Sequence, residues 1–229
     1  MIKKKEKVYL YGSCYGSFRY FVDEIYEKDI NSCTIILIGK FGFNIGFLMR
    51  NEETRELEAL QSLLKNRNIK LMILRSDLDT VDFFQGSFDS ENIEFLPDYA
   101  IKEFNNMQFL FIGGGVSIDR KVKQEGIDYN KEQSIIYSPK NICYSDVLVT
   151  NVAPSWNECA DHIVQTQFFL GDDCIEADLE KERKCVDKII NKSHTKKHFC
   201  GYFDMEHTCI IDGVESTNVG EDQLIEVTF

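Results

Sequence analysis

The stretch "KVYLYGSCYGSFRYFVDEIYEKDINSCTIILIG", residues 7–39, decides the fold. Its two ends, 7–12 and 34–39, are short apolar runs that predict buried strands. Between them, residues 18–28 repeat apolar side chains at helical spacing and predict an amphipathic helix. A strand, a helix and a strand in such close succession predict a right-handed crossover and a parallel pair of strands.

The same cycle continues downstream. Residues 51–68 predict a helix with its leucines on one face, and residues 69–76 predict another buried strand. Residues 98–115 predict a hairpin that turns at Asn105-Asn106, so the sheet becomes mixed from this point. Further strands are expected at 145–154 and in the last thirty residues or so, after a helix ending near residue 193. With no repeat and no linker, we expect a single α/β domain over residues 1–229.

Charge and composition exclude several classes of partner. The 26 basic and 38 acidic side chains give a formal charge of −12, which repels nucleic acid duplexes. No apolar run is long enough to cross a membrane, and the lysine-rich N-terminus lacks the apolar segment of a signal peptide, so we expect a cytoplasmic protein. Eight scattered cysteines without a C-x-x-C pair, Cys14 among them, are expected to be free and mostly buried. The sequence does not indicate the oligomeric state.

Five turns follow apolar strands: "YGSCYG" (11–16), "IGKFGFNIG" (38–46), "LRSDLD" (74–79), "VTNVAP" (149–154) and "FCGYFD" (199–204). In order and spacing they resemble the five motif blocks of calcineurin-like metallophosphoesterases, roughly G-D-x-H-G, G-D-x-G, G-N-H-D/E, T-H-x-x-P and G-H-x-H. The segment "FLFIGGGVSIDRKVKQEGIDYNKEQ" (109–133) is similar to the region that follows the third block in that family. The resemblance implies a four-layer αββα sandwich of two mixed β-sheets flanked by helices. It also implies that Asp119 and Arg120 form an ion pair bracing a loop at the pocket.

The residues that bind two metals in that family are replaced here. The positions that correspond to ligands or to the catalytic histidine are Ser13, Tyr15, Lys40, Asp77, Leu78, Asn151, Gly201 and Phe203. Two neighbouring divalent cations require anionic bridges and neutral imidazoles, and Lys40 stands where the bridging aspartate belongs. We therefore expect no bound metal, no other cofactor and no catalytic residue, while the glycines that shape the turns persist.

The resulting functional hypothesis is a catalytically inactive member of this fold, a pseudoenzyme. It is expected to act as a protein-interaction or structural module, or to bind a phosphorylated small molecule near Lys40 and Arg75. The competing interpretation of these two cations is that they form ion pairs with Asp77 and Asp79.

The alternative is a divergent metal-dependent phosphoesterase that hydrolyses phosphomonoesters or phosphodiesters. It would hold manganese or magnesium at a relocated or single-metal site, with oxygen ligands drawn from Asp77, Asp79, Asp119, Asn151 and Asp204. His194 and His198 are interpreted as an exposed pair rather than metal ligands. Phe83, Phe84 and Phe88 are interpreted as surface aromatics of a lid or an interface.

Overall fold

A computed structural model describes residues 5–42, 51–86, 89–125, 129, 133–160 and 171–229. Its first sheet has the strand order β11-β1-β2-β3-β4. The strands are β1 (Lys7–Tyr11), β2 (Cys33–Leu37), β3 (Ile69–Leu74), β4 (Ile93–Leu96) and β11 (Leu224–Glu226). Strands β1 to β4 are parallel and β11 is antiparallel to β1. The predicted parallel crossover between 7–12 and 34–39 is confirmed.

The second sheet has the order β5-β6-β7-β8-β10-β9. Its strands are β5 (Ala100–Phe104), β6 (Met107–Ile112), β7 (Val147–Thr150), β8 (Lys197–Cys200), β9 (His207–Ile211) and β10 (Val214–Asn218). Strands β6, β7, β8 and β10 are parallel, whereas β5 and β9 are antiparallel edge strands. The predicted hairpin is the β5–β6 pair, and its turn residues Asn105 and Asn106 both have positive φ.

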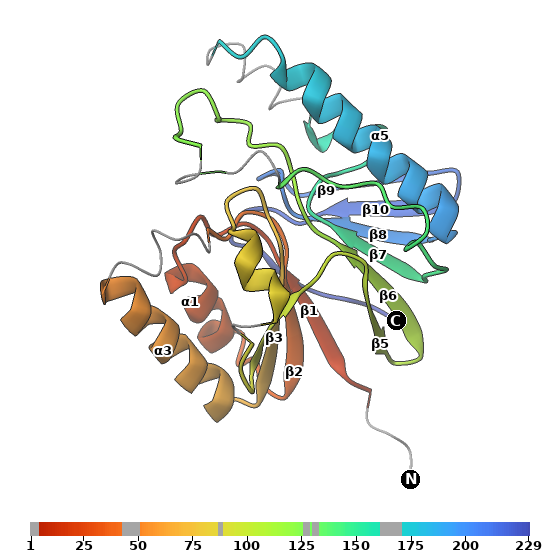
Figure 1. Ribbon diagram of the computed structural model, residues 1–229. Helices are drawn as coiled ribbons and strands as arrows, with labels where there is room; N and C mark the ends of the chain where they lie inside the picture. Colours follow the sequence, from red (N-terminus) through yellow and green to blue (C-terminus); the bar gives the residue numbers. More distant parts are fainter. Residues whose placement is uncertain (1–4, 43–50, 87–88, 126–128, 130–132, 161–170) are drawn as a thin grey trace.

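Helices cover the outer faces of both sheets (Figure 1). The helices α1 (Arg19–Glu27) and α3 (Asn51–Asn66) lie against the first sheet, and α5 (Ile175–Ser193) lies against the second. Short 3₁₀ helices occur at η1 (Val81–Gln85) and η3 (Glu158–Ala160). The predicted four-layer αββα sandwich is confirmed.

Alternate residues of each central strand face different layers. Tyr9 and Tyr11 of β1 belong to the cluster under α1 and α3, whereas Val8 and Leu10 belong to the cluster between the sheets. The third cluster lies between the second sheet and α5 and includes Leu110 and Leu148. Because both faces of a central parallel strand are covered, these strands are apolar throughout rather than alternating.

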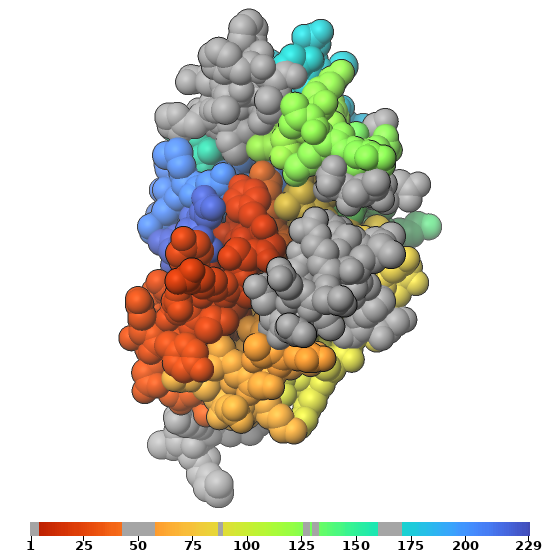
Figure 2. All heavy atoms as spheres, turned by 90° about the vertical axis from the view of Figure 1, so that its left-hand side faces the viewer, coloured from red at the N-terminus to blue at the C-terminus, as the bar shows by residue number. Residues whose placement is uncertain are grey.

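The five predicted turns all follow strands, after β1, β2, β3, β7 and β8. Segments far apart in the sequence meet on this side of the molecule. In Figure 2 the N-terminal segment, red, borders residues near the C-terminus, blue, and the Tyr15 hydroxyl donates a hydrogen bond to Asp204 at 2.6 Å.

Two predictions about side-chain exposure are wrong. Phe83 and Phe84 are buried, because η1 turns both rings onto Phe95 of β4, a strand that the sequence analysis missed. Phe88 lies outside the described residues. His198 is buried in β8 rather than exposed beside His194, because the chain leaves α5 at His194 and enters the sheet at once. In the described part of the chain, no helix is long and apolar enough to span a membrane.

Candidate functional site

Ser13 joins three of the loops that follow the strands. Its hydroxyl donates to the carbonyl of Gly201 at 2.8 Å and accepts from the backbone N–H of Lys40 at 3.0 Å. The side chain is fully buried. A position that carries a metal-binding carboxylate in the resembled family therefore serves here as a hydrogen-bonded connection between the loops after β1, β2 and β8.

Asn151 makes a second connection, between the two sheets. Its side-chain oxygen accepts from the N–H of Gly39 at 2.9 Å, and its amide nitrogen donates to the carbonyl of Arg75. Its backbone carbonyl accepts from the N–H groups of Gly201 and Tyr202. The fully buried side chain thus uses its amide oxygen and nitrogen to bridge the loops after β2 and β3.

Gly39 and Gly201 let these loops approach closely. A Cβ on Gly39, whose φ is 103°, would lie 2.2 Å from the carbonyl oxygen of Gly201 and 2.5 Å from Ser13 Oγ. A Cβ on Gly201 would lie 2.8 Å from the carbonyl oxygen of Ile38. Backbone and short side chains therefore fill this part of the sheet edge.

The Lys40 side chain is almost fully buried between two tyrosine rings. Its ammonium lies 4.6 Å from the ring centroid of Tyr202 and 5.3 Å from that of Tyr15, within the range of cation–π attraction. Within the described residues, no carboxylate lies in ion-pair distance of this ammonium. The aromatic faces are its direct contacts.

Asp77 is a buried carboxylate near Lys40. Its side chain is 1% exposed, and neither carboxylate oxygen has a hydrogen-bond partner. Burial raises the pKa of Asp77 to about 6, while the positive charges of Lys40 and Lys123 oppose that rise. The Lys40 ammonium and the Asp77 carboxylate therefore attract each other without forming an ion pair.

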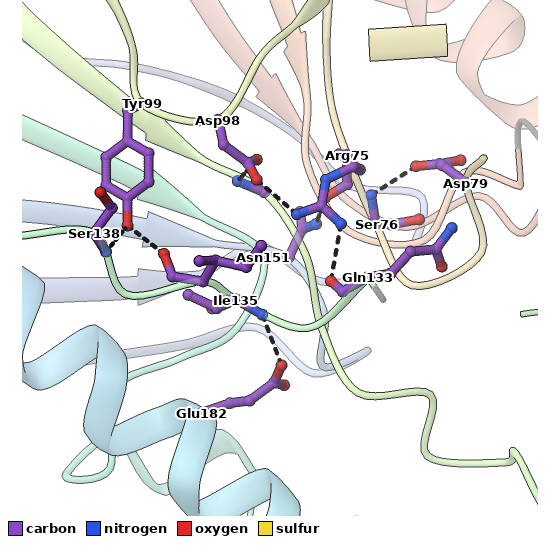
Figure 3. A network of polar contacts seen from close by, with 12 residues as sticks. Arg75, Ser76, Asp79, Asp98, Tyr99, Gln133, Ile135, Ser138, Asn151 and Glu182 are labelled. Carbon is purple, nitrogen blue, oxygen red and sulfur yellow. Dashed lines mark hydrogen bonds and ion pairs between the residues drawn. The ribbon is translucent and has the colours of Figure 1, made fainter. Parts of the chain in front are cut away.

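Arg75 and Asp79 have other partners than those expected (Figure 3). The Arg75 guanidinium pairs with Asp98 at 2.7 Å and donates to the carbonyl of Gln133 at 2.9 Å. The Asp79 carboxylate accepts from the N–H groups of Ser76 at 2.7 Å and Gly42 at 3.1 Å. The prediction that Arg75 pairs with Asp77 or Asp79 is therefore wrong, because the guanidinium points to the loop after β4.

The remaining predicted positions differ in their surroundings. Tyr15 is 44% exposed, at the outer edge of the site, with φ 49°. Leu78 is half-buried, and its N–H donates to the Ser76 hydroxyl. Phe203 is fully buried in the cluster beneath α5, with its ring edge-on to Tyr202. The structure thus brings Ser13, Lys40, Asn151 and Gly201 together and leaves Phe203 in the core.

Tyr202 is a site residue that the sequence analysis did not single out. Its hydroxyl donates to the carbonyl of Val116, and its ring contacts the Lys40 ammonium. It lies inside the motif "FCGYFD", between Gly201 and Phe203, the two positions that correspond to the histidines of the resembled family. The sequence signal for this contact is that Tyr15, Lys40 and Tyr202 lie in three of the five turns, so that a lysine could meet two aromatic rings.

The expected ion pair between Asp119 and Arg120 is also wrong. Asp119 pairs with Lys123 at 2.7 Å and accepts from the Ser117 hydroxyl. Arg120 turns the other way and pairs with Asp172 and Asp178. The two side chains point in different directions, so Asp119 and Arg120 form ion pairs with other residues and not with each other.

Comparison with known proteins identifies solved structures with a similar fold. No family model matches the sequence, and no curated protein matches it. TT1561 of Thermus thermophilus superposes with a TM-score of 0.53 at 10% identity, over 98% of this chain and 99% of that one. The phosphopantetheinyl hydrolase PptH from Mycobacterium tuberculosis superposes with a TM-score of 0.50 at 11% identity, over 96% and 92% of the two chains. The fold is metallophosphoesterase-like.

The side chains at the sheet edge do not fit the two metals that a metallophosphoesterase-like fold implies. Ser13 and Asn151 use their side-chain oxygens to join loops, and Lys40 adds a positive charge where cations would need anions. Over the residues that the structure describes, no three His, Cys, Asp or Glu side chains gather in a way that would hold a metal ion. Asp77 is the one of the eight corresponding positions that carries a carboxylate.

Proposed function

We propose that this chain is a non-catalytic protein of metallophosphoesterase-like fold that acts by binding, as a protein-interaction or structural module. The observation that carries the proposal is the replacement of metal-binding groups by contacts that join the loops. Ser13 and Asn151 connect the loops through hydrogen bonds, and the Lys40 ammonium is held by two aromatic rings. Such contacts stabilise the scaffold without any metal.

The test combines metal content with turnover. Protein purified without chelator is analysed for metals before and after loading with Mn²⁺ or Mg²⁺, and the same samples are assayed with p-nitrophenyl phosphate and bis-p-nitrophenyl phosphate. We expect less than one metal per chain and no hydrolysis above the buffer blank. Metal-dependent hydrolysis that is lost in Asp77→Asn but kept in the exposed control Asp23→Asn would establish a relocated metal site and overturn the proposal.

A phosphorylated small molecule bound at Lys40 is the second candidate. It is favoured by the Lys40 ammonium, which pairs with no carboxylate among the described residues. Calorimetric titration with pyrophosphate and ADP tests this role. Binding that disappears in Lys40→Ala and persists in Lys192→Ala, an exposed lysine in the last turn of α5, would support it. If neither pyrophosphate nor ADP gives a heat of binding, the proposed function stays that of a protein-interaction or structural module.

A further inference from the structure

A cavity opens between α5 and residues of two chain stretches, Val116 to Arg120 and Ser134 to Tyr137. Its volume is about 510 Å³, which falls in the range of small-molecule sites. We call it the α5 groove and define it by Val116 and Ile135, the Tyr137 ring, and the cationic side chains of Arg120, Lys181 and Lys188.

The floor of the α5 groove is held in place by hydrogen bonds to a buried acid. Glu182 of α5 is 5% exposed, and its carboxylate accepts from the N–H groups of Val116 at 2.7 Å and Ile135 at 2.9 Å. Figure 3 shows the contact between Glu182 and Ile135. The Arg120 side chain is fixed by ion pairs with Asp172 at 2.5 Å and Asp178 at 2.7 Å. The groove is therefore preformed, which lowers the entropic cost of binding a ligand.

Two lysines of α5 offer an anion a place to bind, whereas the Asp178 carboxylate that also lines the groove is already paired with Arg120. Lys181 and Lys188 are seven residues apart and so lie on one face of the helix. Neither forms an ion pair with a carboxylate of the described chain, although the protein carries a formal charge of −12. Burial also raises the pKa of Glu182 to about 7, so its negative charge is incomplete at neutral pH.

An aromatic surface accompanies this charge. The Lys188 ammonium lies 5.9 Å from the centroid of the Tyr137 ring, and Tyr137 is 39% exposed. Val116 and Ile135 are apolar and lie beside it. A flat ring stacked on Tyr137 would therefore place a substituent within reach of the lysines.

We propose that the α5 groove binds a small molecule in which an aromatic ring carries a phosphate or carboxylate group. The ring packs against Tyr137, Val116 and Ile135, and the anionic group pairs with Lys181 and Lys188. The groove adjoins the Lys40 site through Val116, whose N–H bonds Glu182 and whose carbonyl accepts from Tyr202, but its lining includes neither Lys40 nor its two tyrosines. The inference does not depend on the proposed function.

The first experiment is a calorimetric titration with three matched probes: naphthyl phosphate, naphthoate and naphthol. We expect at least one of the two anions to bind with a dissociation constant below about 1 mM, and the neutral naphthol to bind at least about tenfold more weakly. Binding of naphthyl phosphate alone would identify phosphate as the group recognised, and binding of both anions would show that a carboxylate suffices. Equal affinity for naphthol, or no binding of either anion, would overturn the proposal.

Variants locate the binding. Tyr137→Ala, Lys181→Glu and Lys188→Glu should each weaken binding of the anion by about tenfold or more. The controls are Lys184→Glu, whose side chain is exposed and pairs with Glu180 on the same helix, and Lys40→Ala in the other site. Both controls should leave affinity within about twofold. Thermal unfolding checks that each variant folds, and anion binding that all three groove variants leave unchanged would contradict the assignment.

Discussion

At the scale of single residues, the site holds a buried carboxylate, Asp77, that lacks an ion-pair partner among the described residues. Neither oxygen of Asp77 has a hydrogen bond of good geometry, although the Ser117 hydroxyl is close enough to lower its pKa, and the Lys40 ammonium contacts tyrosine rings. An ionised carboxylate without hydrogen bonds is unfavourable in a protein interior. Asp77 is therefore expected to reduce the free energy of unfolding at neutral pH.

The first prediction concerns Asp77→Asn. The pKa of Asp77 is raised to about 6 in the folded protein, so the stability linked to its protonated form is present below about pH 4 and lost as pH rises to about 6. Between these values wild type should lose on the order of 2–3 kcal/mol that the variant keeps. Urea unfolding across this range measures the difference. Parallel pH profiles of wild type and Asp77→Asn, with Asp23→Asn as the exposed control, would contradict it.

The second prediction concerns Asn151→Ala. This change leaves the buried N–H of Gly39 without an acceptor and removes one donor from the carbonyl of Arg75. It should lower the free energy of unfolding by about 1–3 kcal/mol for each group left unpaired. Asn141→Ala, at an exposed turn, is the control and should change little. An Asn151→Ala protein as stable as wild type would show that the loops meet without this amide.

At the scale of elements, the two asparagines in the turn of the β5–β6 hairpin have different roles. Asn105 and Asn106 both adopt positive φ, at 53° and 65°, as a type I′ turn requires. Asn105 also exchanges two hydrogen bonds with the backbone of Glu6, so it connects the turn to the chain before β1. Asn106 has no such side-chain contact with the described residues.

The third prediction follows from this difference. Asn106→Gly should raise the free energy of unfolding by up to about 1 kcal/mol, because glycine tolerates the left-handed conformation better. Asn105→Gly relieves the same backbone but loses both contacts to Glu6, so it should be neutral or destabilising. Thermal melts of the two variants test the contrast, which fails if both variants change stability equally and in the same direction.

At the scale of the whole molecule, three apolar layers hold the two sheets and their helices together. A polar side chain, His198 of β8, is also buried in the second sheet. One ring nitrogen lies 2.8 Å from the Thr150 hydroxyl of β7, and the other lies 2.9 Å from the Ser216 hydroxyl of β10. Burial lowers the pKa of His198 to about 3, so the ring is neutral in the folded protein at ordinary pH. It connects three neighbouring strands of the second sheet.

The fourth prediction is an acid-dependent loss of stability through His198. Because the pKa is lower in the folded than in the unfolded protein, stability is lost as pH falls from about 6.5 toward 3, by up to about 1.4 kcal/mol per pH unit. His198→Gln lacks this titration, so its stability relative to wild type should improve steadily with acid. Exposed His194→Asn is the control. A constant difference between wild type and His198→Gln over this range would contradict the prediction.

Much of the fold was predictable because it rests on local pattern. The apolar runs at 7–12, 34–39 and 69–76, with helical spacing between the first pair, indicate parallel strands with both faces covered. Asn105-Asn106 marks the hairpin. Strand β4 escaped prediction because Ile93–Leu96 is only four residues long and interrupted by Glu94. That glutamate pairs with Lys70 of β3, the adjacent strand, and with Lys102 of β5 in the other sheet, and neither contact is visible in the sequence.

The sequence by itself determined the order of most strands and helices, the positions of the turns, and the absence of histidines from those turns. Only the tertiary structure decided which groups pair there. Arg75 pairs with Asp98 rather than Asp77, and Lys40 is held by Tyr15 and Tyr202. The reason is physical: spacing along the chain governs periodic backbone structure, whereas the partner of a buried charge depends on directions and distances that exist only once both sheets have packed.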